Sequence, residues 1–171
     1  CSTGSWAADY PGSFVYQAPR SFAYQWLLNG TAIAGATGNP LTATTAGAYT
    51  CTVTAINQSG TASQTSGAAT TVKAASIKLT LKKKTVKAKP GKVATFTVKA
   101  LNQGDLSAKP KVCVKVPKKA KKALKAPKCK SVGTVGALAN KTTKLKVKLK
   151  PSAAGKYKIT ICTNLPCALQ D

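Results

Sequence analysis

The stretch "AYTCTVTAIN", residues 48–57, alternates Tyr49, Cys51, Val53 and Ala55 with residues that are mostly threonine. An alternation of period two predicts a β-strand with one buried face. Tyr49 lies two residues before Cys51, and this spacing is typical of a tyrosine corner that leads into a core strand. The stretch therefore predicts a strand whose cysteine faces a core.

A second alternating stretch, "FAYQWLL" at residues 22–28, places Trp26 at its centre and is followed by the turn pair Asn29-Gly30. In an immunoglobulin-type sandwich, the cysteine after the tyrosine corner bonds to a cysteine that precedes the tryptophan strand. Cys1 is the only cysteine upstream, so we predict a Cys1–Cys51 disulfide. "CSTGSW", which begins with Cys1, is expected to be a short strand-like segment.

Charge divides the chain into two parts. Arg20, Lys73 and Asp9 are the only charged residues among residues 1–73, so 23 of the 24 net positive charges belong to residues 74–171. Both parts are rich in Thr, Val, Ala, Gly and Ser and lack the Leu-rich periodicity of helices, which indicates an all-β protein. We predict two tandem immunoglobulin-like β-sandwiches, residues 1–73 and 74–171, the second ending in a short C-terminal tail.

Residues 1–73 resemble the bacterial immunoglobulin-like repeats of secreted surface proteins, through "CSTGSW", "YQWLLNGTAIAGATG", "LTATTAGAYTCTVTA" and "INQSGTASQTS". The resemblance implies a sandwich, but such repeats serve as spacers, adhesins and enzyme appendages alike. They carry a strand before the one that holds the first cysteine, whereas this sequence begins on Cys1, so the domain is expected to lack its first strand. Three explanations stay open: the strand lies outside the sequence, a neighbouring subunit donates it, or Cys1 is a lipidated mature terminus. The sequence has no apolar run long enough for a membrane span and no signal-peptide pattern, so we expect a mature or trimmed chain.

Residues 74–171 also show strand patterns, in "VATFTVKAL" (93–101), "KVCVKV" (111–116), "TKLKVKLK" (143–150) and "KYKITIC" (156–162). In the third of these, Leu145, Val147 and Leu149 alternate with lysines, which predicts one core face and one lysine face. Residues 76–162 resemble the bacterial cell-adhesion-related (CARDB-like) domain, through "VKAKPGKVATFTVKALNQGD" and "LKPSAAGKYKITI". This resemblance implies a second β-sandwich.

The chain has six cysteines and no histidine, so zinc sites that mix Cys and His are excluded, and no close Cys-x-x-Cys pairs suggest a Cys-only site. Disulfides are the better interpretation, and they indicate an oxidising, extracellular or cell-surface location. Proximity pairs Cys113 with Cys129 and Cys162 with Cys167. Cys113 shares strand parity with lysines, so its bridge is expected near a sheet edge.

Acid–base chemistry has few candidates, because the chain lacks His, Glu and Met and contains three aspartates, Asp9, Asp105 and Asp171. The chain therefore does not supply the residues needed for a catalytic triad, a two-carboxylate site, a Ca²⁺ site or haem ligation by His or Met. We predict no enzyme activity, no catalytic residues, no metal and no cofactor. An internal Lys–Asn isopeptide bond would need a buried acid, for which Asp105 is the available residue.

The lysine-rich segment between Cys113 and Cys129 is the candidate contact for a polyanion, because released counterions favour such binding. A solvated lysine face that aids solubility and protects sheet edges is the competing interpretation. Residues 74–171 contain no arginine and two aromatic residues, so specific nucleic-acid recognition is not expected. The polyanion candidates are Lys118, Lys119, Lys121, Lys122, Lys125 and Lys128.

Two functions follow as hypotheses. The first is a non-enzymatic extracellular structural or adhesive surface protein, with a sharper variant in which it is the repeating subunit of a fibre completed by strand donation between copies. The second is a binding module for anionic polymers, such as a cell-wall polymer, a polysaccharide or non-specifically bound nucleic acid.

Overall fold

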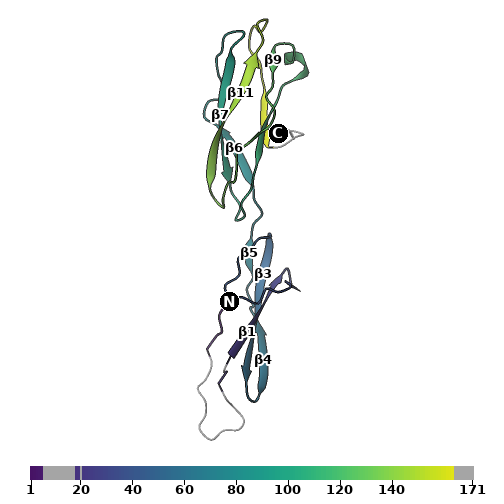
Figure 1. Ribbon diagram of the computed structural model, residues 1–171, viewed down its shortest axis with the longest axis vertical. Coiled ribbons are helices and arrows are strands. Elements are labelled where there is room, and N and C mark those ends of the chain that lie inside the picture. Colours follow the sequence, from purple (N-terminus) through teal and green to yellow (C-terminus); the bar gives the residue numbers. More distant parts are fainter. Residues whose placement is uncertain (6–17, 20, 164–171) are drawn as a thin grey trace. The chain divides into compact units, whose positions relative to one another are not determined.

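The computed structural model describes residues 1–5, 18–19 and 21–163 and is an all-β structure with antiparallel sheets. The chain divides into two compact units, Cys1–Ala74 and Ala75–Asp171. This boundary lies one residue from the division that the charge distribution predicts. Each unit has its own sheets (Figure 1).

The described residues of the Cys1–Ala74 unit form one sheet in the order β2-β1-β3-β4. β5 also pairs with β3, at the end of β3 that β4 does not reach. Figure 1 shows β1, β3 and β4 side by side. The strands are β1 (Ser21–Leu28), β2 (Thr31–Ala32), β3 (Gly47–Asn57), β4 (Gly60–Thr65) and β5 (Thr70–Val72).

A tight turn at Asn29 and Gly30 joins β1 to β2, as the sequence predicts. Both residues have positive φ angles, 51° and 81°, and Leu28 pairs with Thr31. Two central residues with positive φ are the geometry of a type I′ hairpin turn, which Asn-Gly adopts readily. The Asn29 side-chain oxygen also accepts a hydrogen bond from the Ala48 amide at 2.9 Å, which ties the turn to β3.

The cysteine of β3 has the surroundings that its sequence pattern predicts. Cys1 and Cys51 are joined by a disulfide, with their Cα atoms 6.1 Å apart, and Trp26 is the cross-strand partner of Cys51. The Tyr49 hydroxyl donates a hydrogen bond of 2.8 Å to the Thr45 carbonyl, which is the contact of a tyrosine corner. Tyr49 and Cys51 are both buried.

Two features of this unit differ from expectation. Cys1–Ser5 contains no strand, although "CSTGSW" was expected to be strand-like. Its backbone is instead held by the Asn39 side chain, whose amide donates to the Cys1 carbonyl at 2.7 Å. The described residues of the Cys1–Ala74 unit form one sheet and no second layer, while residues 6–17 and 20 lie outside the described part of the chain.

The Ala75–Asp171 unit has a four-stranded sheet in the order β6-β7-β11-β9 and a three-stranded sheet in the order β10-β8-β12. A short 3-10 helix, η1 (Lys118–Ala120), lies between β8 and β9. The strands are β6 (Ile77–Leu81), β7 (Val93–Asn102), β8 (Lys111–Lys115), β9 (Leu124–Lys125), β10 (Lys130–Ser131), β11 (Asn140–Leu149) and β12 (Thr160–Thr163).

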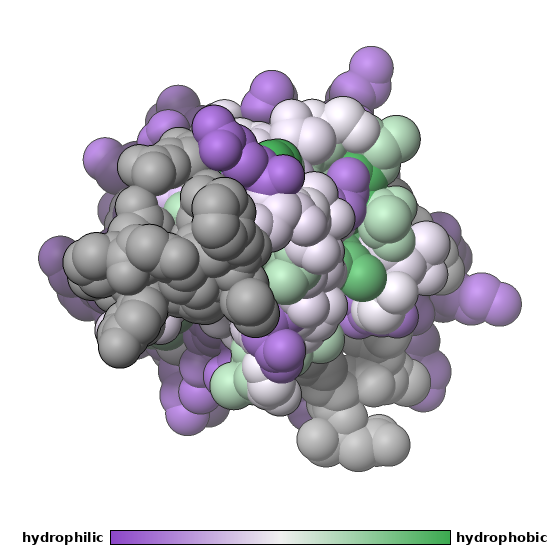
Figure 2. Space-filling view, turned by 90° about the horizontal axis from the view of Figure 1, so that it is seen from below, coloured by the Kyte–Doolittle hydropathy of each residue, from purple (hydrophilic) through white to green (hydrophobic). Residues whose placement is uncertain are grey.

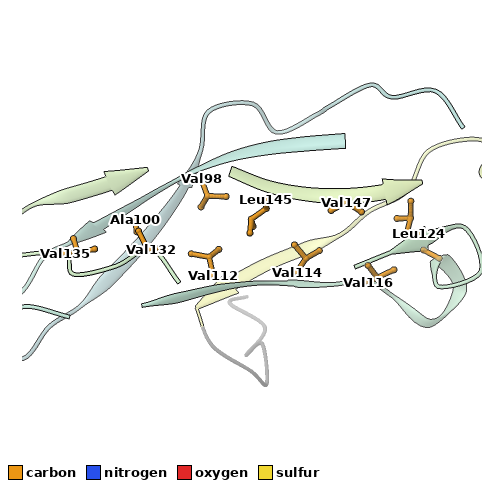
Figure 3. Close-up of a cluster of buried hydrophobic side chains, with 11 residues drawn as sticks. Val98, Ala100, Val112, Val114, Val116, Leu124, Val132, Val135, Leu145 and Val147 are labelled. Carbon is orange, nitrogen blue, oxygen red and sulfur yellow. The ribbon is translucent and has the colours of Figure 1, made fainter. Parts of the chain in front are cut away.

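The two sheets of this unit share one apolar core. Val98, Leu145 and Val147 of the larger sheet face Val112 and Val114 of the smaller one (Figure 3). All five side chains are buried, and burying a side chain of this size contributes about 1.5–3 kcal/mol. The alternation in "KLKVKLK" thus has the predicted result, with apolar residues inside and lysines exposed.

Some strand boundaries differ from the sequence predictions. β12 begins at Thr160 instead of residue 156, and β11 begins at Asn140 instead of residue 143. Before β12 the chain makes a local contact in place of sheet pairing, because the Ala154 amide donates to the Tyr157 hydroxyl at 3.0 Å. β8 ends at Lys115, two residues before Pro117, which has no amide hydrogen for a sheet ladder.

Asn102, at the end of β7, is a fully buried polar side chain. Its oxygen accepts hydrogen bonds from the Ser76 and Gly104 amides, each at 3.1 Å. Its amide group donates to the carbonyls of Leu106 at 2.7 Å and Gly136 at 2.9 Å. A single side chain therefore joins three loop segments at this end of the unit.

Candidate anion-binding groove

A depression of about 820 Å³, open to solvent, lies in the Ala75–Asp171 unit where β8 leads into η1 and β9. Five lysines surround it, and the walls are apolar. The lining lysines are Lys115, Lys118, Lys121, Lys125 and Lys150, and the other lining residues are Val114, Val116, Pro117, Leu124 and Ala126. We call this depression the basic groove.

The segment that carries most of these lysines is held by its small apolar residues. Ala120, Ala123 and Leu124 are buried, while the four lysines of "KKAKK" are exposed. The Ala120 amide donates to the Pro117 carbonyl at 2.9 Å, and the Ala123 amide donates to the Ala120 carbonyl at 3.0 Å. These turns direct the lysine side chains outward, because the alanines occupy the inner side.

The basic groove also depends on a long-range pairing. β9 pairs with the end of β11, with Leu124 opposite Leu149, and the Lys150 amide donates to the Ala123 carbonyl at 2.8 Å. This pairing brings Lys150 beside a segment about 25 residues earlier in the chain. The groove is therefore a product of the fold and not of the lysine-rich segment alone.

The six lysines that the sequence analysis proposed divide into two sets of three. Lys118, Lys121 and Lys125 line the basic groove, whereas the other three are exposed and do not line it: Lys119, Lys122 and Lys128. Sequence reasoning missed Lys115 and Lys150. The alternation in "KVCVKV" indicated that Lys115 lies on the exposed face of its strand. No sequence pattern near Lys150 indicates that this residue lies at the groove.

The electrostatics of the basic groove are one-sided. No acidic residue lines it, and Asp105 is the one carboxylate side chain within the described residues. Asp105 follows β7 at its Asn102 end, whereas the groove lies near the Val93 end, where Leu149 donates its amide hydrogen to the Lys92 carbonyl. An anion in the groove would therefore meet cations without competition from a neighbouring carboxylate.

Lysines also cover the outer face of the larger sheet. Lys144, Lys146 and Lys148 of β11 are exposed, and Lys148 lies directly opposite Lys125 of β9. Figure 2, which views the molecule from below, shows hydrophilic side chains that project around the outline.

Two cysteines of this unit lie on paired strands, Cys113 on β8 and Cys162 on β12, and Cys129 directly precedes β10. Cys113 bonds to Cys129, with Cα atoms 4.2 Å apart, and Cys162 is the cross-strand partner of Cys113. Cys162 is also disulfide-bonded, and Cys167, its expected partner, lies outside the described residues. The bridge was expected near a sheet edge. Cys113 itself is buried on β8, the central strand of its sheet, and the bond reaches Cys129, which directly precedes the edge strand β10.

Within the described residues, no group of three His, Cys, Asp or Glu side chains could hold a metal ion, and no helix is long and apolar enough to cross a membrane. No protein-family model, curated protein or solved structure matches the chain. The basis for a functional assignment is therefore the chemistry of the basic groove.

Proposed function

We propose that the chain is a non-enzymatic extracellular adhesive module, whose Ala75–Asp171 unit binds anionic polymers in the basic groove. The observation that carries this proposal is the set of five lysines around one apolar-walled depression, with no acidic side chain among its lining residues. Each lysine that meets a negative charge releases counterions, and this release favours binding. The absence of histidine and glutamate from the sequence supports a role without catalysis.

An extracellular location agrees with the disulfides, because such bonds persist in oxidising compartments. An immunoglobulin-like sandwich for the first unit is supported by the tyrosine corner and by the position of Trp26 opposite Cys51. In the second unit, two sheets around one core support the sandwich that its sequence resemblance implies. Both folds are common in modules that present a binding surface without chemistry.

The test compares two triple variants with the same net charge. One replaces the groove residues Lys118, Lys121 and Lys125 with glutamine, and the other replaces Lys119, Lys122 and Lys128, which lie on the same segment outside the groove. Binding to an immobilised sulfated polysaccharide is measured over a range of salt concentrations. Five groove contacts predict a slope of about −4 in a plot of log K against log salt concentration.

The groove variant is expected to lose about two units of this slope, and the matched variant is expected to lose much less. Equal losses in the two variants would show that binding follows net charge and not the groove. Binding of the wild type that does not change with salt would also contradict the proposal.

A second candidate function is that of a fibre subunit in which copies join by strand donation. The observation in its favour is β4, the last strand in the sheet order of the first unit, whose six residues are all exposed and include no charge and no proline. Natural edge strands that avoid pairing with another chain usually carry a charged residue or a proline, and β4 carries neither. Ser63→Lys should then abolish filaments seen by electron microscopy. A wild type that stays monomeric at high concentration, with rapid hydrogen exchange in β4, would contradict this candidate.

A further inference from the structure

The outer face of the larger sheet carries a row of exposed lysines that begins at the basic groove. Strand register fixes its order, because directly paired residues share a face of the sheet. We call this row the lysine track, and in order from the groove it comprises Lys125, Lys148, Lys146, Lys144, Lys99 and Lys78.

Neighbouring members of the lysine track are close enough to contact one extended chain. Lys125 and Lys148 are direct cross-strand partners, and such pairs have Cβ atoms about 5 Å apart. Successive lysines of β11 are two residues apart, a distance of about 6.8 Å along an antiparallel strand. The steps to Lys99 and then to Lys78 are diagonal, and diagonal neighbours lie about 7–8 Å apart.

The lysine track and the basic groove share one residue. Lys125 lines the groove and also lies opposite Lys148, at the edge of the sheet face. A ligand that leaves the groove past Lys125 therefore meets the ammonium groups of β11 next. The two surfaces form a continuous cationic path from the groove across the sheet to β6.

The residues beside the lysine track are neutral. Thr97 lies opposite Lys144, Thr95 lies opposite Lys146, and Thr80 lies opposite Lys99. Like charges placed directly opposite one another destabilise a sheet, and the Lys125–Lys148 pair has this arrangement. A bound polyanion would remove that repulsion. A row of alternating positive and negative charges would gain much less stability from a bound polyanion.

We propose that the lysine track binds an extended, base-free phosphodiester polymer of the poly(glycerol phosphate) type, which enters at the basic groove and continues along β11. This inference rests on the proposed function of the groove and names the polymer class that both surfaces accept together.

The spacing of charges selects this class. A poly(glycerol phosphate) repeat has as many backbone bonds as two amino-acid residues, so its extended length is about 7 Å. Lysines at alternate positions of β11 repeat at about 6.8 Å, which places one ammonium group beside each phosphate. In a polyuronate the sugar ring sets the spacing of the carboxylates, so the charges do not follow the strand repeat.

The absence of stacking partners on the lysine track disfavours nucleic acids with the same phosphodiester repeat. Phe96 pairs with Leu145 and packs against the core, and Tyr157 also packs against it. Single-stranded nucleic acids gain much of their affinity from bases that stack on aromatic side chains. Threonine hydroxyls beside the track offer hydrogen bonds to phosphate or to glycerol hydroxyl groups instead.

The experiment measures binding of poly(glycerol phosphate) oligomers of increasing length to the full chain by calorimetry. Four proteins are compared: the wild type, the groove variant (Lys118→Gln, Lys121→Gln, Lys125→Gln), a track variant (Lys144→Gln, Lys146→Gln, Lys148→Gln) and a control variant (Lys109→Gln, Lys111→Gln, Lys156→Gln). The control lysines are exposed residues of the same unit that lie outside both the groove and the track. Oligothymidylate and polygalacturonate of equal charge number are the comparison ligands.

Wild-type affinity should rise with oligomer length until the oligomer covers both the groove and the track. If each of the five groove lysines and the five further track lysines contacts one phosphate, this length is roughly ten phosphates. The track variant should bind long oligomers with a salt slope smaller by about two and an affinity lower by on the order of 100-fold at low salt. Oligomers of three phosphates should bind the wild type, the track variant and the control variant equally.

Four results would overturn the inference. A track variant that matches the control shows that the sheet face is only solvated surface, and groove variants with weakened binding would then leave the proposed function standing. Tighter binding of oligothymidylate would identify nucleic acid as the partner. Polygalacturonate that binds as tightly as poly(glycerol phosphate) would refute the spacing argument. Binding that neither groove nor track variants weaken would contradict the proposed function as well.

Discussion

The Cys113–Cys129 bond stabilises the second unit and also closes the segment that carries four of the five groove lysines. Replacing both cysteines with alanine removes a crosslink across a sequence separation of 16. In the chain-entropy model, a loop of this length corresponds to about 3 kcal/mol of unfolding free energy. The loss of the buried Cys113 side chain adds to this amount, because its exposed fraction is 1%. We therefore expect a decrease of about 3–4 kcal/mol.

The matched variant replaces Cys1 and Cys51, whose sequence separation is 50 and whose bond belongs to the first unit. The same model gives about 4 kcal/mol for this crosslink. Urea unfolding separates the two effects, because both tryptophans belong to residues 1–73. Tryptophan fluorescence should report the loss of the first bond, and hydrogen exchange at the amides of β7 and β11 should report the loss of the second.

Binding gives the decisive difference between the two variants. Without the Cys113–Cys129 bond, the segment from η1 to Cys129 samples more conformations, so ordering it costs entropy when a polyanion binds. Affinity for a sulfated polysaccharide should fall about tenfold in this variant, which corresponds to about 1.4 kcal/mol, and should stay unchanged in the Cys1–Cys51 variant. Equal affinities in both variants would refute the link between the bond and the groove. A stability loss below about 1 kcal/mol would refute the entropy estimate.

Three further predictions concern the fold. Tyr49→Phe removes the hydrogen bond to Thr45 and should lower the unfolding free energy of the first unit by about 1 kcal/mol, measured by urea denaturation with tryptophan fluorescence. Leu145→Ala should cost the second unit about 3–5 kcal/mol in calorimetric unfolding, because this side chain is 1% exposed at the centre of the core. Asn102→Asp should destabilise the second unit increasingly as pH rises, because the new carboxylate would face the carbonyls of Leu106 and Gly136 and its pKa would be raised in the folded state. A flat dependence of this variant's stability on pH from 3 to 7 would contradict that reasoning.

Local patterns predicted those features whose cause is local. Period-two alternation located β3 and the inward and outward faces of β11, since a half-buried strand needs that pattern. Asn29-Gly30 predicted a type of turn that needs two positive φ angles, and the structure has both. The Tyr49–Cys51 spacing predicted a tyrosine corner, and in the structure the Tyr49 hydroxyl makes this contact within one short segment, with the Thr45 carbonyl.

Features that depend on distant pairing were beyond these patterns. Lys150 reaches the basic groove because β9 pairs with the end of β11, and a two-residue strand such as β9 has too few positions to show an alternation. The bridge of Cys113 was expected near a sheet edge because Cys113 shares parity with lysines; long-range pairing instead places Cys113 on a central strand, with Cys129 beside the edge strand β10. Asn102 resembled an ordinary turn residue in "NQGD", and its contacts with Gly104 and Leu106 are local. Only the folded chain brings the Ser76 amide and the Val135 and Gly136 carbonyls to this side chain.

The lysine content has a structural cost that a purely solvating role does not explain. Lysines that only maintain solubility can occupy any exposed position, so a sheet would gain by placing neutral or acidic residues between them. Here Lys125 and Lys148 oppose each other at the point where the sheet face meets the groove, and Thr95, opposite Lys146, is the diagonal neighbour of Lys148 on β7. An acidic residue at Thr95 would relieve that repulsion and should stabilise the isolated protein. If Thr95→Glu raises the unfolding free energy and weakens polymer binding, the repulsion is retained for binding. If binding does not change, the result favours the solvating role of the lysines.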